Sequence, residues 1–259
     1  MDRKAYYNEI DPYAAQWLRN LIAAGHIPDG DVDERSIIDV QPMDLKNYAQ
    51  CHFFAGIAGW SYALRLAGWP DDRPIWTGSC PCQPFSVAGK KRGKDDERHL
   101  WPHFFRLIRE CRPEIVMGEQ VAGKAGYDWL DGVCADLEAE DYACQSVDIP
   151  ACAVNAPHIR QRLYWVAVAD ANRGGQRECT QQHSNKAQPK QQASFGDNFS
   201  GRHFWGSTEW LTGADGKTRR TKPGVRLLAH GVPGRVGRLR AYGNAIVPQV
   251  AAEVIKCLI

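Results

Sequence analysis

The stretch Gln50-Cys51-His52-Phe53-Phe54-Ala55-Gly56-Ile57-Ala58-Gly59 decides the fold of this 259-residue chain. Its first part is typical of a buried strand, and its two glycines precede a helical pattern at residues 60–67 that Gly68 ends. Glycines in such a turn let a ligand approach the backbone, and the helix N-terminus adds partial positive charge. The spacing differs from the usual dinucleotide fingerprint, so a simple tight turn remains an alternative.

Strand and helix patterns alternate on both sides of this stretch. Residues 28–31 have the composition of a turn. The other expected elements are a short strand and a helix within 5–24, strands at 74–78, 114–118 and 163–168, and helices at 100–111, 129–139 and 247–258. This alternation predicts an α/β fold with a mostly parallel sheet and helices on both of its faces.

The composition changes at about residue 170. The segment 172–197 is rich in Gln, Asn, Ser and Gly and poor in aliphatic residues, as in a loop, a linker or a small domain with little core. We therefore expect a main domain formed by residues 1–169 and 236–259, and a small separate region at 170–235. Phe204, Trp205 and Trp210 are the candidates for the core of the small region.

The net charge is only +2, but the basic residues are clustered. One cluster is Lys90, Lys91, Arg92 and Lys94, and a late stretch runs from Arg219 and Arg220 to Arg240. Such clusters can bind phosphates, although each one alone is equally well explained as a solvated surface. Nine scattered cysteines, with no apolar leader and no membrane-spanning run, favour a reducing cytoplasm and no membrane association.

Pro81-Cys82-Gln83-Pro84 is the strongest chemical signal. Two prolines rigidify the end of a strand and present Cys82 beside a glycine-rich, basic loop. A thiol becomes a nucleophile where its surroundings favour the thiolate, although most cysteines are merely structural. Cys80 and Cys82 have poor spacing for zinc without a second pair of ligands, so we expect no metal.

Three further residues are candidates for the same chemistry. Glu119 directly follows the strand at 114–118, and the carboxyl ends of such strands are where sites form. Burial could keep this carboxyl protonated as an acid, or it could be a capping or surface glutamate. Arg160 and Arg162 alternate on one side of the chain and could bind a carbonyl, a carboxylate or a phosphate, or lie in solvent at an edge.

Together these residues resemble the DNA (cytosine-5) methyltransferase family. The matching blocks are Phe54 to Gly59, Pro81 to Ser86, Glu119-Gln120-Val121, Arg160-Gln161-Arg162 and Gly243 to Pro248. They occur in the family's order and cover most of residues 1–168 and 240–259. The resemblance implies a Rossmann-like S-adenosylmethionine-dependent methyltransferase sheet with a small target-recognition region, here residues 170–235, which is short for the family.

The resemblance also implies a mechanism. The thiolate of Cys82 adds to C6 of a cytosine flipped out of double-stranded DNA, which makes C5 nucleophilic toward the methyl group. Protonated Glu119 donates to N3, Arg162 holds O2, and Arg160 supports the glutamate and the loop. The stretch 87–97 closes over the DNA backbone.

The site residues that the resemblance implies form two further sets. The S-adenosylmethionine site is expected to include Glu9, Ile10, Asp31, Phe54, Ala55, Gly56, Ile57, Gly59, Pro81, Leu100, Asn244 and Ala245. The DNA contacts are expected to come from Gln83, Ser86, Lys90, Lys91, Arg92, Lys94, Arg98, Arg219 and Arg220. Sequence-specific contacts are expected within 170–235.

The chain departs from the family's pattern in the order of its cofactor blocks. The interval between the helix at 60–67 and the cysteine block is too short for the two strands that the family places there. Asn8-Glu9-Ile10-Asp11 and Gly30-Asp31-Val32 resemble those missing blocks but lie upstream. We therefore expect a permuted order, with Glu9 on the ribose, Ile10 on the adenine face and Asp31 on the adenine amine. Otherwise Glu9 and Asp31 are surface acids.

Smaller departures are Gln120 in place of the usual Asn and His158 in place of the usual Gln, and neither removes a reacting group. Two other functions remain: an RNA (tRNA) cytosine-5 methyltransferase, or a non-catalytic DNA-binding relative, against which the retained Cys82, Glu119 and Arg162 argue. The compact form resembles phage-encoded members. We expect a monomer in the cytoplasm of a bacterial or phage-infected cell.

Overall fold

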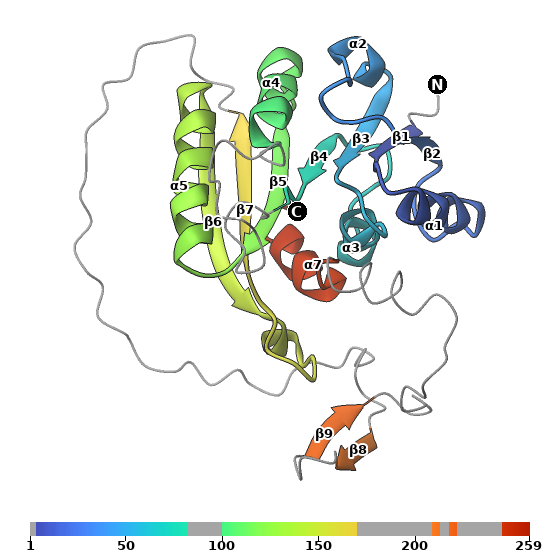
Figure 1. Cartoon of the computed structure of the whole chain (residues 1–259), viewed down its shortest axis with the longest axis vertical. Coiled ribbons are helices and arrows are strands. Elements are labelled where there is room, and N and C mark those ends of the chain that lie inside the picture. Colours follow the sequence, from blue (N-terminus) through green and yellow to red (C-terminus); the bar gives the residue numbers. More distant parts are fainter. Residues whose placement is uncertain (1–3, 82–99, 170–208, 213–217, 222–244) are drawn as a thin grey trace, which may run out of the picture. The chain divides into compact units, whose positions relative to one another are not determined.

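A computed structural model describes residues 4–81, 100–169, 209–212, 218–221 and 245–259. The chain divides into two compact units: Met1–Asp170 with Leu228–Ile259, and Ala171–Leu227. The first unit contains a seven-stranded sheet with the order β2-β1-β3-β4-β5-β7-β6 (Figure 1). In the second unit, the described residues form the antiparallel pair β8 (Glu209–Thr212) and β9 (Thr218–Thr221).

The sheet is mostly parallel, as the sequence predicted. Five adjacent strands run in the same direction, and β7 is antiparallel to both of its neighbours. The strands are β1 (Lys4–Asn8), β2 (Gly30–Asp33), β3 (Tyr48–Phe53), β4 (Ile75–Gly78), β5 (Ile115–Val121), β6 (Tyr142–Pro150) and β7 (Gln161–Ala169).

Helices cover both faces of the sheet. One face packs against α2 (Pro42–Leu45), α4 (Trp101–Cys111) and α5 (Lys124–Ala139), whose buried side chains share one apolar cluster with Tyr6 and Phe53. The other face packs against α1 (Pro12–Ala23) and α3 (Gly59–Ala67), through Ala5 and Tyr7. The C-terminal α7 (Pro248–Lys256) packs against α3 (Figure 1). This arrangement confirms the predicted α/β fold.

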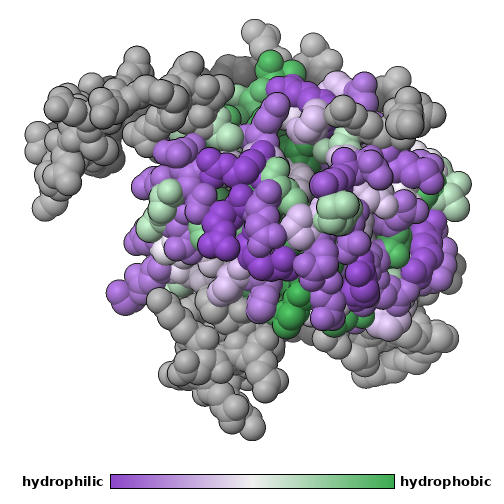
Figure 2. Space-filling view, turned by 90° about the horizontal axis from the view of Figure 1, so that it is seen from above, coloured by the Kyte–Doolittle hydropathy of each residue, from purple (hydrophilic) through white to green (hydrophobic). Residues whose placement is uncertain are grey.

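The surface of the described part is mostly hydrophilic, as expected when the apolar side chains are packed in the core. Seen from above, hydrophilic residues cover most of the visible face and apolar residues form separate patches (Figure 2). No described helix is long and apolar enough to cross a membrane.

Three sequence-based assignments differ from the structure. Gly30 and Asp31 were predicted in a turn, but they begin the edge strand β2, because parallel pairing with Ala5 and Tyr6 extends the backbone there. Strand β6 was not predicted, because all but one of its residues are exposed or only partly buried, and Gln145, Ser146 and Asp148 interrupt the apolar signature that the central strands carry. The 3-10 turn η3 (Ala151–Val154) that follows β6 was also not predicted.

His52 on β3 is a histidine that is buried in the core. Its Nδ1 lies 2.8 Å from the Thr77 hydroxyl and its ring stacks on Tyr7, while Nε2 has no partner among the described residues. Burial lowers the pKa of His52 to about 3. A charged imidazole is therefore excluded from the folded state at neutral pH.

We expect the fold to lose stability in mild acid because of His52. Its pKa is lower in the folded state than the usual 6.5, so its contribution is complete above pH 6.5 and falls as pH decreases toward 3. The loss should be about 1.4 kcal/mol per pH unit, or roughly 2 kcal/mol at pH 5. Urea unfolding at several pH values measures it. His52→Gln should lack this slope, and equal slopes in both proteins would contradict the assignment.

Candidate functional site

The carboxyl ends of the parallel strands gather most of the described candidate residues at one edge of the sheet. In this strand order, chain connections leave β1 toward one side and β3 toward the other, so the sheet has its switch point between these two strands. Ligand sites of open α/β sheets form at such a point, where the adjacent loops diverge. The turn after β1 carries Glu9 and the turn after β3 carries the glycines.

The turn between β3 and α3 has an unusual backbone. Phe54, Gly56 and Ala58 have positive φ angles of 52°, 54° and 68°. Glycine adopts this conformation without strain, which explains its use at position 56. The turn also requires glycine at position 59, because a Cβ atom there would lie 2.7 Å from Ile246. The predicted strand-turn-helix is therefore confirmed, and its backbone lies close to the C-terminal segment.

Glu9 connects the end of β1 to this glycine turn. Its carboxylate accepts hydrogen bonds from the backbone N–H of Gly56 at 2.7 Å and of Asp11 at 2.9 Å. The N–H of Ala55 also donates to the Asn8 carbonyl at 3.0 Å. Residues far apart in the sequence are thus brought together as predicted, and Glu9 is not an isolated surface acid.

Ile10, the next residue, is 65% exposed although it is a large aliphatic side chain. It lies between the buried end of β1 and α1, whose N-terminus is capped by Asp11. The sequence analysis assigned Ile10 to an adenine face, and an exposed aliphatic side chain beside Glu9 is suited to that contact.

The structure places Asp31 differently from Glu9. Asp31 pairs with Tyr6, two residues before the end of β2, and accepts a hydrogen bond from the Tyr48 hydroxyl at 2.8 Å. Asp33 is the residue that reaches the carboxyl end, where it pairs with Asn8 and its carbonyl accepts from the N–H of Glu9. The sequence analysis did not single out Asp33, because only the register of β1 and β2 reveals its position.

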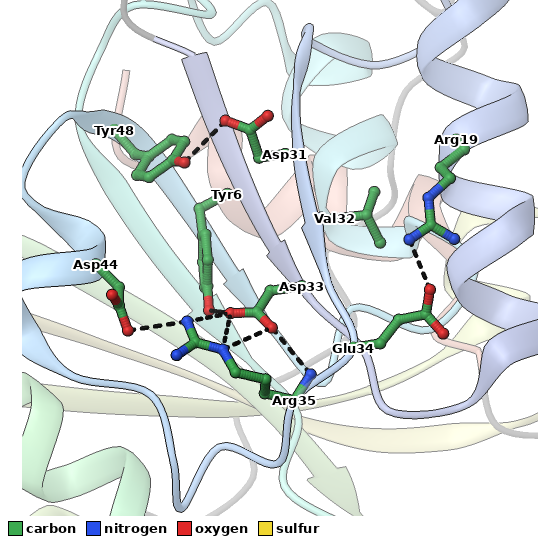
Figure 3. A pocket seen from close by; sticks show the side chains of 9 residues that line it. All are labelled: Tyr6, Arg19, Asp31, Val32, Asp33, Glu34, Arg35, Asp44 and Tyr48. Carbon is green, nitrogen blue, oxygen red and sulfur yellow. Dashed lines mark hydrogen bonds and ion pairs between the residues drawn. The ribbon is translucent and has the colours of Figure 1, made fainter.

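A polar pocket of about 390 Å3 lies over these strands (Figure 3). In Figure 3, Asp31 points toward Tyr48, while Asp33 points toward Tyr6 and Arg35. Arg35 also bonds to Asp44 at 2.9 Å. Burial would raise the pKa of Asp33, but hydrogen bonds from Arg35 and Tyr6 outweigh it and lower that pKa. Asp33 is therefore held as a carboxylate.

Glu119 lies near the carboxyl end of β5 and is only 8% exposed. Its Oε1 lies 2.7 Å from Nε of Arg162, which comes from the antiparallel neighbour β7. Burial raises the pKa of Glu119, while Arg162, Arg160 and a hydrogen bond with Ser79 act in the opposite direction. The resulting raised pKa is what a carboxyl group needs to remain protonated as an acid.

Two residues that the sequence analysis did not assign support Glu119. The indole N–H of Trp60 donates to the Ser79 hydroxyl at 3.0 Å, which leaves the hydroxyl hydrogen for Glu119. Ser79 lies in the segment Gly78-Ser79-Cys80-Pro81, three residues before Cys82. In the sequence, only the position of Ser79 beside the cysteine block could have indicated that it supports Glu119.

Gln120, which replaces the family's usual Asn, also contacts this segment. Its amide nitrogen lies 3.4 Å from the Cys80 carbonyl, and its amide oxygen accepts from the N–H of Val121. The side chain is buried. The longer glutamine thus links the end of β5 to the residues that precede Cys82.

The two arginines make different contacts. Arg162 bonds to Glu119, whereas Arg160, with a φ of 27°, donates to the Ala245 carbonyl at 2.6 Å. Ala245 therefore contacts Arg160 through its backbone, and Ile246 contacts Gly59. The C-terminal segment is joined to both the glycine turn and the arginine block.

The structure also describes the surroundings of five other predicted site residues. Leu100 caps the N-terminus of α4, Phe54 packs edge-on against Phe104, and Pro81 is exposed after the buried Cys80. Arg219 and Arg220 lie in β9 of the second unit, opposite Leu211 and Trp210. The remaining predictions lie outside the described residues: Cys82, Gln83, Ser86, Lys90, Lys91, Arg92, Lys94, Arg98, Phe204, Trp205 and Asn244.

Within the described ranges, no group of three or more His, Cys, Asp or Glu side chains is arranged to hold a metal ion. The described cysteines are all free thiols.

Comparison with known proteins identifies a family model that matches more than half of the chain. Residues 68–222 match the family model described as "C-5 cytosine-specific DNA methylase". This range includes Cys82, Glu119, Arg160 and Arg162. Glu9, Asp31 and the glycine turn lie before it.

Two of the relatives match over shorter segments. The Type II methyltransferase M.AgeI of Thalassovita gelatinovora is 32% identical over 107 residues, which are 40% of this chain and 25% of that protein. M.NgoMIV of Neisseria gonorrhoeae is 49% identical over 53 residues, or 20% of this chain and 17% of that protein. The matched segments thus span no more than a quarter of these two relatives.

A solved structure with a similar chain path is a DNA modification methyltransferase encoded within an E. coli prophage. It has a TM-score of 0.43 and 23% sequence identity, over 64% of this chain and 40% of that one.

Proposed function

Because this chain belongs to the C-5 cytosine-specific DNA methylase family, we propose that it methylates C5 of cytosine in double-stranded DNA. The observation that carries this proposal is the buried Glu119, held by Arg162 and Ser79 beside the strand end that leads to Pro81-Cys82. A buried carboxyl with a raised pKa, a cysteine and a paired arginine are the three groups that the reaction requires.

Cys82 is proposed as the nucleophile. Its thiolate forms a bond to C6 of the flipped cytosine, and the electron pair of the C5–C6 double bond becomes available at C5. Glu119 supplies a proton to N3 as that charge develops, which requires Glu119 to be protonated before the step. Loss of the C5 proton later expels the thiolate and restores the ring.

Arg162 is proposed to act on the same base. Its Nε holds Glu119, which leaves the terminal nitrogens of the guanidinium to face O2 of cytosine. One of these, Nη1, donates to the Gln161 carbonyl, which fixes the plane of the group. Arg160 has a positioning role, because it attaches the arginine block to the C-terminal segment through Ala245.

S-adenosylmethionine is proposed as the cofactor, and the described residues fit it. The glycine turn has positive φ angles, Glu9 lies against it, and Ile10 offers an exposed apolar face. When bound, the cofactor supplies an electrophilic methyl group. Glu9 would hold the ribose hydroxyls, Ile10 would pack on the adenine, and the backbone of 56–59 would surround the methionine end. Phe54, Leu100, Asn244 and Ala245 are proposed to line the same pocket.

The permuted order of the cofactor blocks is also proposed, and the handedness of the connections supports it. The connections β1-α1-β2 and β3-α3-β4 cross the sheet in opposite directions, yet α1 and α3 lie on the same face. The two connections therefore have opposite hands. The connection β4-α4-β5 runs in the direction of β3-α3-β4, but α4 lies on the other face.

Parallel crossovers are right-handed in about 98% of cases. The connection through α3 has the opposite hand to the connections through α1 and α4. It would agree if α3 led to β1 instead of β4, which is the order expected for an unpermuted chain. This reasoning supports the placement of β1 and β2 as displaced cofactor strands.

Glu9→Ala tests the cofactor site. Losing charge-assisted hydrogen bonds from a partly buried carboxylate costs about 2–5 kcal/mol, so affinity for S-adenosylhomocysteine should fall well over tenfold. Calorimetric titration measures this change. Glu110→Ala, which removes an exposed acid near the end of α4 that pairs with Arg106, is the matched control. Wild-type affinity for Glu9→Ala would mean that the upstream blocks are a chance resemblance.

A second titration distinguishes the contributions of the two aspartates of β2, Asp31 and Asp33, to cofactor binding. Asp31 was assigned to the adenine amine from the sequence, but Asp33 lies nearer to Glu9 in the sheet. We expect Asp33→Asn to weaken cofactor binding by about tenfold, the value of one good hydrogen bond, and Asp31→Asn to have less effect. Asp44→Asn also removes a partner of Arg35 and controls for loss of that network. The opposite ranking would favour Asp31.

The DNA contacts are proposed to come from the stretch 83–98 and from the second unit, including Arg219 and Arg220, with sequence readout within 170–235. We also propose a monomer in the cytoplasm, and a role in restriction-modification, since the relatives are Type II methyltransferases. Exchanging 170–235 with the same region of a relative should change the methylated sequence.

Bisulfite sequencing of DNA from cells that express the protein tests the proposed activity and identifies its target site. Parallel assays with tRNA test the RNA alternative, against which the family description argues. Methylation of tRNA alone would overturn the DNA assignment. Binding to DNA with no methylation of either substrate would favour the non-catalytic relative.

A further inference from the structure

Cys134 and Cys144 lie on a helix and a strand that are consecutive in the chain. Helix α5 ends at Ala139, and β6 begins at Tyr142 after a tight turn. Cys134 is five residues before the end of the helix and Cys144 is two residues into the strand. At about 1.5 Å per helical residue and about 3.3 Å per strand residue, both lie roughly 7 Å from the turn. The two side chains are therefore at the same level.

The two thiols also face each other. Leu130, Val133 and Leu137 form the buried side of α5, and Cys134 lies beside them on the helix surface. Tyr142 is buried on the same face of β6 as Cys144, because alternate residues share a face. Both cysteines pack against the same apolar cluster and their sulfurs are joined by a hydrogen bond.

The two cysteines differ in reactivity. The interaction between the two thiols lowers the pKa of Cys134 and raises that of Cys144, so Cys134 forms a thiolate more readily than its neighbour. Both are partly exposed, so a small reagent can reach them. Cys51 and Cys80 are instead buried, and burial raises the pKa of both thiols. The pair thus combines an accessible nucleophile with a second thiol in contact.

We propose that Cys134 and Cys144 are a redox-modification site that forms a reversible intramolecular disulfide with a low-molecular-weight disulfide such as oxidised glutathione. The Cys134 thiolate attacks one sulfur of the reagent and releases one thiolate. The Cys144 sulfur then loses its proton and attacks Cys134, which releases the second. Two protein thiols are oxidised and one disulfide is reduced to two thiols.

The site is separate from the proposed methyl-transfer site. Cys144 pairs with Ala167 near one end of β7, whereas Arg162 lies near the other end and pairs with Ile149. The inference therefore does not rest on the proposed function. The bond would fasten α5 to the edge strand β6, and so should raise the thermal unfolding midpoint by about 5 °C.

The experiment treats the full chain with oxidised glutathione and digests it, without reduction, with a protease that cuts after glutamate. Glu138 and Glu140 lie between the two cysteines, so only a disulfide keeps their peptides joined. We expect the joined peptides in the wild type, with two hydrogen atoms fewer than the separate peptides. The thermal midpoint should rise, and dithiothreitol should reverse both changes.

Variants identify the partners. Cys144→Ser should stop at a glutathione adduct on Cys134, with no joined peptides and no rise in the midpoint. Cys152→Ser removes an exposed cysteine a few residues further along and should behave as the wild type does. Separate glutathione adducts on Cys134 and Cys144 in the wild type, unmodified thiols at both positions, or joined peptides that persist in Cys144→Ser would each overturn the proposal.

Discussion

Replacing Cys82 by alanine is expected to abolish methyl transfer, with a loss in kcat of roughly four orders of magnitude or more. Without the thiolate, C6 receives no nucleophile and C5 is too weak to accept a methyl group. The variant should still fold and bind DNA, because the substitution removes only one sulfur atom and adds neither bulk nor charge. Transfer of a radiolabelled methyl group to DNA measures the activity, and gel-shift titration measures the binding.

Cys80→Ala is the matched control, since it removes a thiol two residues away. The Cys80 side chain is buried, but its contact with Gln120 is made by its backbone carbonyl and survives the change. Activity should therefore change far less than in Cys82→Ala. Measurable turnover by Cys82→Ala would contradict the nucleophile assignment, and an equal loss in Cys80→Ala would revive a metal role for the pair.

Glu119→Gln is expected to lower kcat by about 10²- to 10⁴-fold, because glutamine cannot transfer a proton to N3. The pH dependence gives a second readout. Burial raises the pKa of Glu119, so the protonated, active form persists to higher pH than for an ordinary glutamate. In the wild type, kcat/KM should fall as pH rises through that pKa, which gives the pH profile an alkaline limb. Glu119→Gln should show no such fall.

Ser79→Ala refines the same test. Its hydrogen bond acts to lower the pKa of Glu119, so its removal should move the alkaline limb to higher pH while reducing kcat modestly. Glu114→Gln, at an exposed position just before β5, should leave the profile unchanged. An unaltered pH profile in Glu119→Gln would show that another group controls the alkaline limb.

The sequence predicted the central elements well because each carries a clear physical signal. Residues 115–118 are all apolar or glycine, as a strand covered on both faces must be, and they lie in β5. Gly68 ends α3 with a φ of 85°, a conformation that favours glycine. The glycine turn was therefore placed correctly at the end of β3. Glu119 was assigned to the correct strand but predicted just beyond its end, whereas β5 continues to Val121 and includes Glu119.

Contacts between distant segments could not be predicted in the same way. The bond from Arg160 to Ala245 and the packing of Gly59 on Ile246 depend on how the last helix docks, which no local pattern encodes. The difference between Asp31 and Asp33 depends on the register of two edge strands, and both residues look alike in the sequence. Long-range register and docking are set by packing of the whole sheet.

The docking of α7 on α3 determines the point during synthesis at which the protein can bind small ligands. The turn that carries Gly56 leaves the ribosome early, together with Glu9, but Ile246 and α7 are made almost 190 residues after Gly59. Until then one wall of the turn is missing and its apolar surface is open to solvent. A nascent chain should therefore hold a nearly finished sheet with little affinity for small ligands, and gain that affinity abruptly once α7 has been made and has docked.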